Sequence, residues 1–186
     1  QRYALGIEYI GTFYKGWQKQ KKTDSTVQEN VDTALSKIAD ETIKTTCSGR
    51  TDSGVHAHKM IAHFDARFDS NLNSNFVYKL NQFLPEDISV NSIRRVKDDA
   101  HARFDALSRT YEYFINSKKT PFGNEFHYNL DQSLDIKAMK EATKLLIQYD
   151  DFECFSKSRT DVKTFICNIS FADWTLIENG YKFTIT

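Results

Sequence analysis

The sequence has few cysteines, few prolines and no long apolar run, and each shortage excludes a class of protein. Its 186 residues include 3 cysteines and 2 prolines. An odd number of widely separated cysteines gives neither the disulfide framework of a small secreted protein nor the paired spacing of a zinc site. No stretch approaches the roughly 18 apolar residues of a membrane-spanning helix, and residues 1–5 lack the apolar core of a signal peptide. We therefore expect a protein of the reducing cytoplasm that has no contact with a membrane.

An excess of charge of either sign is also missing, because 25 basic residues balance 25 acidic ones. A neutral total argues against a protein that binds nucleic acid with its whole surface. The basic residues nevertheless gather in three clusters: Lys15, Lys19, Lys21 and Lys22 around Trp17; Arg94, Arg95 and Lys97; and Lys157, Arg159 and Lys163. Two interpretations stay open. Each cluster is an ordinary solvated face, or together they line a positive cleft on a neutral body.

Hydrophobic periodicity predicts three helices and seven strands. Alternation typical of strands occurs over residues 3–9, 43–48, 60–65, 89–96, 108–115, 165–176 and 181–186, and helical spacing over 27–38, 75–83 and 134–147. Thr26, followed three residues later by Glu29, predicts a capping box at the start of the first helix. Residues 11–22 are expected to be a polar loop with an exposed aromatic group, and residues 123–131 an irregular stretch.

The order of these elements predicts an α+β fold. Several successive strands have no helix between them, which indicates a largely antiparallel sheet with helices on one face. Residues 178–180 are expected to form the turn of a closing hairpin. The pattern predicts two ferredoxin-like, RRM-like halves, residues 1–100 and 101–186.

One stretch concentrates groups that can do chemistry. Between two predicted strands, Gly49 and Gly54 enclose Arg50 and Asp52, and His56 follows. An aspartate in such a loop is often a turn residue that bonds its own backbone. Loops on a rigid sheet also carry catalytic residues, and the residue types alone leave both interpretations open.

A metal site and a phosphate loop are less compatible with the same stretch. On a strand, His56 and His58 share a face and His63 lies on the other. The sequence contains no paired cysteine motif and no HExxH run. The loop also lacks the GK[ST] ending of a P-loop. We therefore expect no bound metal.

The loop resembles the signature of the tRNA pseudouridine synthase A family, whose pattern reads GRTDxGVHA. Six further blocks resemble the family's motifs, occur in the family's order and cover nearly the whole chain. They are YIGTFYKGWQKQ at 9–20, TVQENVDTAL at 26–35, LNQFLPEDI at 80–88, HARFDA at 101–106, RTYEY at 109–113 and DFECF at 151–155.

This resemblance implies the pseudouridine synthase fold and an isomerase. Such an enzyme converts uridine to pseudouridine at positions 38–40 of the anticodon stem-loop of tRNA, with no cofactor, and acts as a homodimer with one tRNA spanning both subunits. A second hypothesis is a non-catalytic RNA-binding module that uses Trp17, Tyr111 and Tyr113 of a ferredoxin-like sheet as stacking platforms. Asp52 separates the two, because a binding surface gains nothing from a carboxylate that repels phosphates.

Three residues match the family's catalytic positions. Asp52 matches the nucleophile, which attacks C1′ or C6 of the nucleotide or assists an elimination. Arg50 matches the arginine that enters the space left by the extruded base, and its alternative is a salt bridge to Asp52. Tyr111 matches the tyrosine that lies against the uracil, and its alternative is a core aromatic residue.

Further residues are candidates for contact with tRNA. They are Lys15, Trp17, Gln18, His56 and Arg103. His56 is expected to bond either RNA or a backbone carbonyl, and Arg103 either supports the loop or binds phosphate. Members of the family continue beyond a strand such as 181–186 with a segment whose arginine pairs with the aspartate. We therefore expect this chain to be a fragment with an incomplete catalytic centre.

Overall fold

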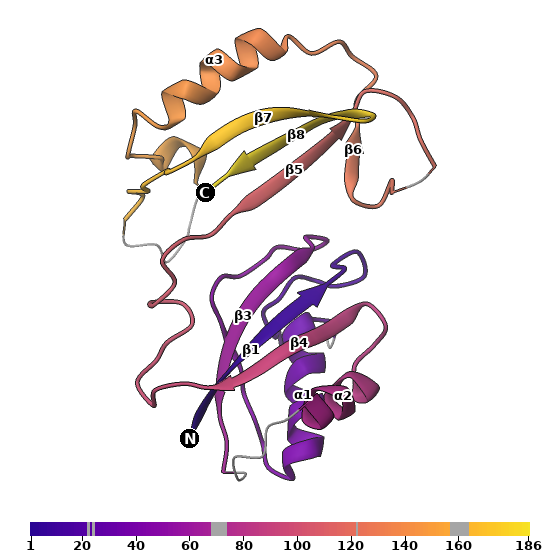
Figure 1. Cartoon of the computed structure of the whole chain (residues 1–186), viewed down its shortest axis with the longest axis vertical. Helices are drawn as coiled ribbons and strands as arrows, with labels where there is room; N and C mark the ends of the chain where they lie inside the picture. Colours follow the sequence, from indigo (N-terminus) through magenta and orange to yellow (C-terminus); the bar gives the residue numbers. More distant parts are fainter. Residues whose placement is uncertain (22, 24, 68–73, 122, 157–163) are drawn as a thin grey trace. The chain divides into compact units, whose positions relative to one another are not determined.

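Two four-stranded sheets, one in each half of the sequence, organise the chain (Figure 1). The computed structural model describes residues 1–21, 23, 25–67, 74–121, 123–156 and 164–186. They divide into two units, Gln1–Leu107 and Ser108–Thr186. The predicted α+β class is confirmed, and so is the largely antiparallel pairing, because β5 with β6 is the one parallel pair among the strands of the described residues.

The first unit has the strand order of a ferredoxin-like fold. Its elements are β1 (Arg2–Tyr9), α1 (Val27–Ala39), β2 (Thr46–Cys47), β3 (Ala57–Asp65), α2 (Ser74–Phe83) and β4 (Ile88–Arg95). The sheet order is β2-β3-β1-β4, and every neighbouring pair is antiparallel. A chain that runs β-α-β-β-α-β in this order is the split-βαβ arrangement that the sequence pattern predicts.

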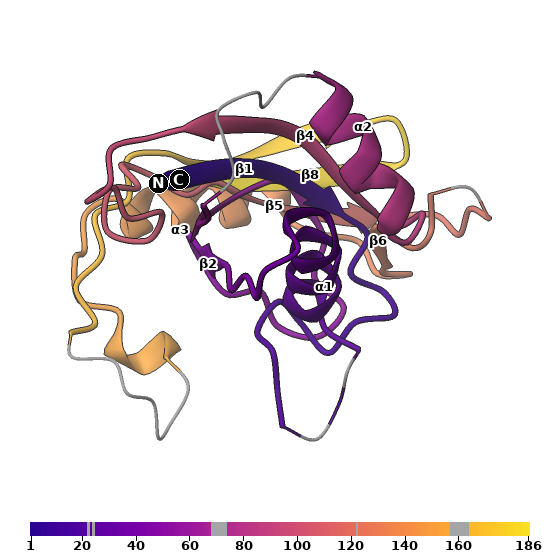
Figure 2. The ribbon, with the colours of Figure 1, turned by 90° about the horizontal axis from the view of Figure 1, so that it is seen from below.

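Alternation along β1 explains why both helices of this unit cover the same face of the sheet. Tyr3, Leu5, Ile7 and Tyr9 are buried in one core cluster with residues of α1 and α2, among them Leu35. Glu8, which points the other way, is exposed. Each fully buried side chain of this size contributes about 1.5–3 kcal/mol. Figure 2 shows α1 end-on beneath β1.

The first helix begins where the sequence predicts. The Thr26 side chain accepts a hydrogen bond from the Glu29 N–H at 3.3 Å, which satisfies one of the free donors of the first turn and stabilises the helix by about 1 kcal/mol. The Glu29 carboxylate forms an ion pair with Lys19 at 2.5 Å. The helix ends at Asp40 in the left-handed conformation, with φ 51°.

The strand predicted over residues 43–48 is wrong in length, since only Thr46–Cys47 pair with β3. Side chains of α1 take the backbone donors that a longer strand would use. The Ile43 N–H donates to Ser36 Oγ at 2.9 Å. The Thr45 N–H and hydroxyl both donate to the Asp32 carboxylate, at 2.9 and 2.7 Å.

The second unit has a sheet of order β6-β5-β8-β7. Its elements are β5 (Tyr111–Asn116), β6 (His127–Asn129), α3 (Ile136–Leu146), the 3-10 turn η1 (Glu153–Phe155), β7 (Ala172–Ile177) and β8 (Gly180–Ile185). The predicted hairpin is confirmed by the antiparallel pairing of β7 with β8. The stretch predicted to be irregular contains β6, whose three residues are too few to show alternation in the sequence.

The predicted strand over 165–176 begins late, at Ala172. The residues before it pair elsewhere, because the Cys167 N–H donates to the Asp150 carbonyl at 2.8 Å and the Phe152 N–H to the Phe165 carbonyl at 3.1 Å. The strand predicted from residue 108 likewise begins at Tyr111.

Residues 101–107 belong to the first unit, so the predicted boundary after residue 100 falls inside that unit. Arg2 Nη1 donates to the Ala100 carbonyl at 3.0 Å. The Ala102 N–H donates to His63 Nδ1 at 3.0 Å, and the rings of His63 and His101 lie 4.7 Å apart. His63 on β3 therefore anchors the segment that leaves the unit.

This anchor predicts an acid-sensitive stability. His63 is 7% exposed. Burial is the main reason why the pKa of its imidazole lies below the ordinary 6.5, with the charges of Arg2 and His101 adding to the effect and Asp65 and Asp105 opposing it. The unfolded chain therefore takes up the proton first. The contribution of His63 to the free energy of unfolding is complete above pH 6.5 and is lost as the pH falls below it.

We expect urea titrations to show this loss, and His63→Gln to reduce the dependence on pH. His58→Gln is the matched control, because His58 is an exposed histidine on the same strand. An identical pH dependence in the wild type and in His63→Gln would show that another group is responsible.

Candidate active site

The loop between β2 and β3, residues 48–56, exposes the side chains of Arg50 and Asp52. The loop begins where the pairing of β2 with β3 ends, at the hydrogen bond that the Ser48 N–H donates to the Ile61 carbonyl at 2.7 Å. The Asp52 carbonyl accepts from the Val55 N–H at 3.2 Å. Gly54 at the third position of this turn has φ 80°, as a type II turn requires. Asp52 is thus the first residue of a tight turn and also presents its carboxylate to solvent.

Three hydrogen bonds tie residues 51–54 of this loop to the segment that follows β1. The Trp17 N–H donates to the Thr51 carbonyl at 3.1 Å, and the Gly54 N–H donates to the Tyr14 carbonyl at 3.2 Å. The Ser53 hydroxyl donates to the same Tyr14 carbonyl at 3.1 Å. The backbone on both sides of Asp52 is therefore fixed by residues about 40 positions earlier in the chain.

The same segment is tied to the start of α1. The Val27 N–H donates to the Gly16 carbonyl at 3.3 Å, and the Gln28 N–H donates to the Trp17 carbonyl at 3.0 Å. These are two of the donors that a helix leaves free at its first turn. Residues 16–17 therefore connect a helix end to the loop that carries Asp52.

Two glycines of this segment are required by close contact between backbones. A Cβ on Gly16 would lie 2.5 Å from the Thr51 carbonyl oxygen, and Gly16 has φ 90°. A Cβ on Gly11 would lie 2.0 Å from the Val55 carbonyl oxygen. Only a residue without a side chain lets the two segments approach this closely.

The exposed aromatic residue predicted in residues 11–22 is Phe13, which is 77% exposed, and not Trp17, the residue predicted to stack on tRNA. The Trp17 side chain is 0% exposed, and its ring centroid lies 5.9 Å from that of Tyr9. A buried ring presents no face to a base, so Trp17 supports the loop from behind and is not a stacking contact in this structure. The charged residues around it in the sequence obscure this, because they remain on the surface while the ring turns inward.

The other residues of this region that are predicted to contact tRNA differ in their exposure and in their partners within the protein. Lys15 is exposed. The Gln18 amide donates to Gln28 Oε1 at 3.0 Å, and Lys19 is paired with Glu29. Two parts of the basic pattern, Lys22 and the cluster of Lys157, Arg159 and Lys163, lie outside the described residues.

His56 fixes the far end of the loop. Its Nδ1 accepts a hydrogen bond from the Gly11 N–H at 3.1 Å. In the neutral ring the proton is then on Nε2. The structure thus shows His56 as an acceptor for a backbone N–H through Nδ1.

Arg50 and Arg103 both act electrostatically on Cys47 in the first unit. Burial raises the pKa of the Cys47 thiol, and the charges of both arginines act in the opposite direction. Both guanidinium groups therefore lie within electrostatic range of the same thiol. The thiol itself is buried and stays protonated, which makes it a structural group and not a reactive one.

Tyr111 belongs to the second unit, where it is the first residue of β5. It is 56% exposed, so the alternative that it is a core aromatic residue is wrong. Its cross-strand partner is Ile185, and Tyr113 on the same face of the strand is opposite Phe183. This face therefore carries an exposed aromatic surface.

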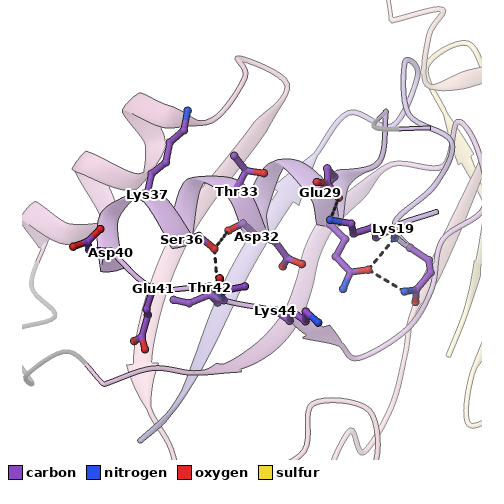
Figure 3. Close-up of a pocket in the computed structure, with 13 residues that line it drawn as sticks. Lys19, Glu29, Asp32, Thr33, Ser36, Lys37, Asp40, Glu41, Thr42 and Lys44 are labelled. Carbon is purple, nitrogen blue, oxygen red and sulfur yellow. Dashed lines mark hydrogen bonds and ion pairs between the residues drawn. The ribbon is translucent and has the colours of Figure 1, made fainter. Parts of the chain in front are cut away.

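A polar groove of about 860 Å³ lies elsewhere on the first unit, along α1 and residues 40–44 (Figure 3). None of its lining residues comes from the loop of residues 48–56. Both acidic and basic side chains line it, and burial raises the pKa of Asp32 among them. In the described part of the chain, no group of three or more His, Cys, Asp or Glu side chains is placed to hold a metal ion.

The described helices include none with both the length and the apolar character needed to cross a membrane.

Comparison with known proteins gives a consistent result. Residues 6–105 match the family model described as tRNA pseudouridine synthase. Proteins named tRNA pseudouridine synthase A are similar over most of the chain. One from Bacteroides thetaiotaomicron is 48% identical over 96% of this chain and 65% of its own length. Those from Bacteroides fragilis and Parabacteroides distasonis are each 45% identical over the whole of this chain and 73% of their own length. The chain therefore spans about two thirds to three quarters of these relatives.

Sequence reasoning missed the residues that hold the loop in place, namely Tyr9, Tyr14 and Gly16. The signal was present in the block at 9–20, where two glycines and four aromatic residues stand close together. A glycine pair next to aromatic residues indicates a close approach of two backbones as well as a flexible loop.

Proposed function

The chain belongs to the tRNA pseudouridine synthase family, whose members are isomerases that form pseudouridine in tRNA, and we propose that the protein containing it acts on uridines at positions 38–40 of the anticodon stem-loop. One observation carries this proposal above the others. The loop that matches the family's signature exposes Asp52 on a turn that is held to Tyr14 and Trp17 by two backbone hydrogen bonds and by the Ser53 hydroxyl.

The reaction breaks the bond between ribose C1′ and N1 of uracil, turns the base and joins C1′ to C5. The proton on C5 leaves and N1 takes one up, so the reaction needs no cofactor and no redox change. A carboxylate suits it because it adds covalently and later leaves. In the proposal Asp52 has this role, and its exposure leaves it open to a substrate.

The target base must leave its stem-loop to reach such a carboxylate. Arg50 is assigned to the space that the base vacates, because a planar guanidinium both stacks and bonds to phosphate. Arg103, whose charge acts on the same Cys47 thiol as that of Arg50, is assigned to phosphate, and Tyr111 to the face of the uracil. Lys15, Gln18 and the Nε2 of His56 are the remaining assigned contacts with tRNA.

The test is release of tritium from tRNA labelled at C5 of uridine, measured with the full-length gene product. Release with multiple turnover supports the proposal. Tight tRNA binding without release would contradict it and would support a non-catalytic RNA-binding module. Sequencing of the product tRNA shows whether the modified uridines are at positions 38–40.

The proposal also includes a homodimer in the cytoplasm, with one tRNA spanning both subunits. Three cysteines without disulfides in the described residues are consistent with a reducing compartment. Analytical ultracentrifugation of the free protein and of its tRNA complex measures the assembly. A complex of one monomer with one tRNA would contradict the dimer.

We further expect the affinity for tRNA to depend on salt through Lys15 and Lys21. Both are exposed, whereas Lys19 is already paired with Glu29. Replacing the first two by Ala should flatten the slope of log K against log salt by about 0.7–0.9 for each phosphate that the variant no longer neutralises. Lys44→Ala is the matched control, because it removes an exposed lysine at the end of the groove along α1. Equal slopes in the double variant and the control would show that the cluster is only a solvated face.

A further inference from the structure

A hydrogen bond between two hydroxyl groups lies next to Asp52 in the first unit, and the proposed function gives it no role. The Tyr9 hydroxyl lies 2.8 Å from Thr51 Oγ1. Tyr9 is the last residue of β1, and its side chain is 4% exposed. Thr51 is the residue directly before Asp52.

This hydrogen bond completes the restraint on Thr51. The Thr51 carbonyl accepts from the Trp17 N–H at 3.1 Å, so the residue is held at its backbone and at its side chain. A threonine side chain has stiff χ1 rotamers, and a bond to Oγ1 selects one of them. Fixing both groups restricts the backbone torsions that aim the next residue.

The Tyr9 phenol is suited to a permanent role of this kind. Burial is the main cause that raises the pKa of Tyr9 to about 12, against the opposing effect of the bond to Thr51. The phenol therefore stays neutral and keeps its proton across the range in which an enzyme works. Its ring packs against Trp17, so the hydroxyl is carried by a side chain that cannot turn away.

We propose that Tyr9 is a positioning residue for Asp52, which acts through the hydroxyl of Thr51 to aim the carboxylate at the nucleotide. The inference rests on the proposed function, because it takes Asp52 as the nucleophile. The backbone torsions before Asp52 set the range of directions that its carboxylate can take, and catalysis needs the few in which it meets the reacting carbon. The hydrogen bond narrows that range from behind the loop, where it does not touch tRNA.

The test compares single-turnover rates and tRNA affinities of full-length variants. Tyr9→Phe removes one oxygen and keeps the ring, and Thr51→Val removes the partner hydroxyl. Each should lower the rate of the chemical step by about tenfold to a hundredfold, the effect of a misplacement of about 1 Å or less, with an unchanged Kd for tRNA. The double variant should be no slower than the slower single variant, because both remove the same bond. Thr51→Ser, which restores an oxygen at the same position, should recover most of the rate.

Tyr3→Phe is the matched control. Tyr3 lies on the same strand with its side chain 0% exposed, and its hydroxyl donates to Gln1 Oε1 at 2.8 Å, far from the loop in sequence. This variant should react at the wild-type rate. A rate within about twofold of wild type for both Tyr9→Phe and Thr51→Val, or equal losses in Tyr3→Phe, would overturn the inference.

A second measurement separates this inference from the proposed function. Amide hydrogen exchange of the Trp17 and Gly54 N–H groups, which donate to Thr51 and Tyr14, reports on the loop without any reaction. Exchange should be faster in Tyr9→Phe and unchanged in Tyr3→Phe. If the wild-type protein forms no pseudouridine, the proposed function fails. The exchange rates still decide whether Tyr9 holds the loop. Unchanged exchange in Tyr9→Phe would overturn the inference even in an active enzyme.

Discussion

Asp52→Asn is expected to abolish pseudouridine formation and to leave the fold and the tRNA affinity in place. The amide has nearly the same shape as the carboxylate, and the side chain is exposed, so burial and packing stay the same. What disappears is the ability to add covalently to the nucleotide. The rate should fall by at least about 10³-fold, which corresponds to about 4 kcal/mol in the barrier.

Tritium release measures the rate, filter binding measures the affinity and circular dichroism confirms the fold. Glu86→Gln is the matched control, because it removes an exposed carboxylate elsewhere in the same unit and should react at the wild-type rate. Residual activity of Asp52→Asn within about tenfold of wild type, a barrier change of about 1.4 kcal/mol, would rule out a covalent role for Asp52.

The second large effect is expected from Gly16, whose backbone lies against that of Thr51. Gly16→Ala should destabilise the first unit and displace the loop that carries Asp52. A residue with a side chain loses about 1–2 kcal/mol at a positive φ. In addition, the new Cβ would lie 2.5 Å from the Thr51 carbonyl oxygen, so the two backbones must separate. A shift of about 1 Å at the nucleophile lowers the rate by about a hundredfold.

Gly54→Ala separates these two causes. Gly54 also has a positive φ, of 80°, but a Cβ there would have no heavy atom within 4 Å. It should therefore show the cost of the backbone conformation without the clash. Thermal unfolding of the two variants gives the difference in stability. If Gly16→Ala is no less stable than Gly54→Ala and reacts at the wild-type rate, the close approach of residues 16 and 51 has no functional importance.

Much of the fold was predictable, because its main signals are local. Alternation along β1 and helical spacing along α1 are continuous patterns, and Thr26 marks the start of the helix in both sequence and structure. The glycine-bounded loop was identifiable as a candidate site through its resemblance to the family's signature, because its residue types alone also fit an ordinary turn. Tertiary interactions explain where the observed strands differ from the predicted ones. Asp32 and Ser36 take the donors of residues 43–45, and no pattern within residues 43–48 shows that.

Trp17 shows most clearly what the sequence alone cannot predict. Within a window of charged residues, a single tryptophan is compatible with a surface contact and with an anchor. What decides between them is a pair of backbone hydrogen bonds, from Trp17 to Thr51 and from Gln28 to Trp17. Both partners are distant in the sequence, so only the folded chain reveals the ring as part of the core.

The burial of Trp17 has a spectroscopic consequence. The chain has 2 tryptophans, and the second, Trp174 on β7, lies in the other unit. Trp17 is 0% exposed, whereas Trp174 is only half-buried. Trp174→Phe therefore leaves one fluorophore, with the emission of an apolar environment, directly behind the loop of residues 48–56. Its wavelength reports whether that loop is seated, in real time and without a label, as tRNA binds or as the first unit unfolds.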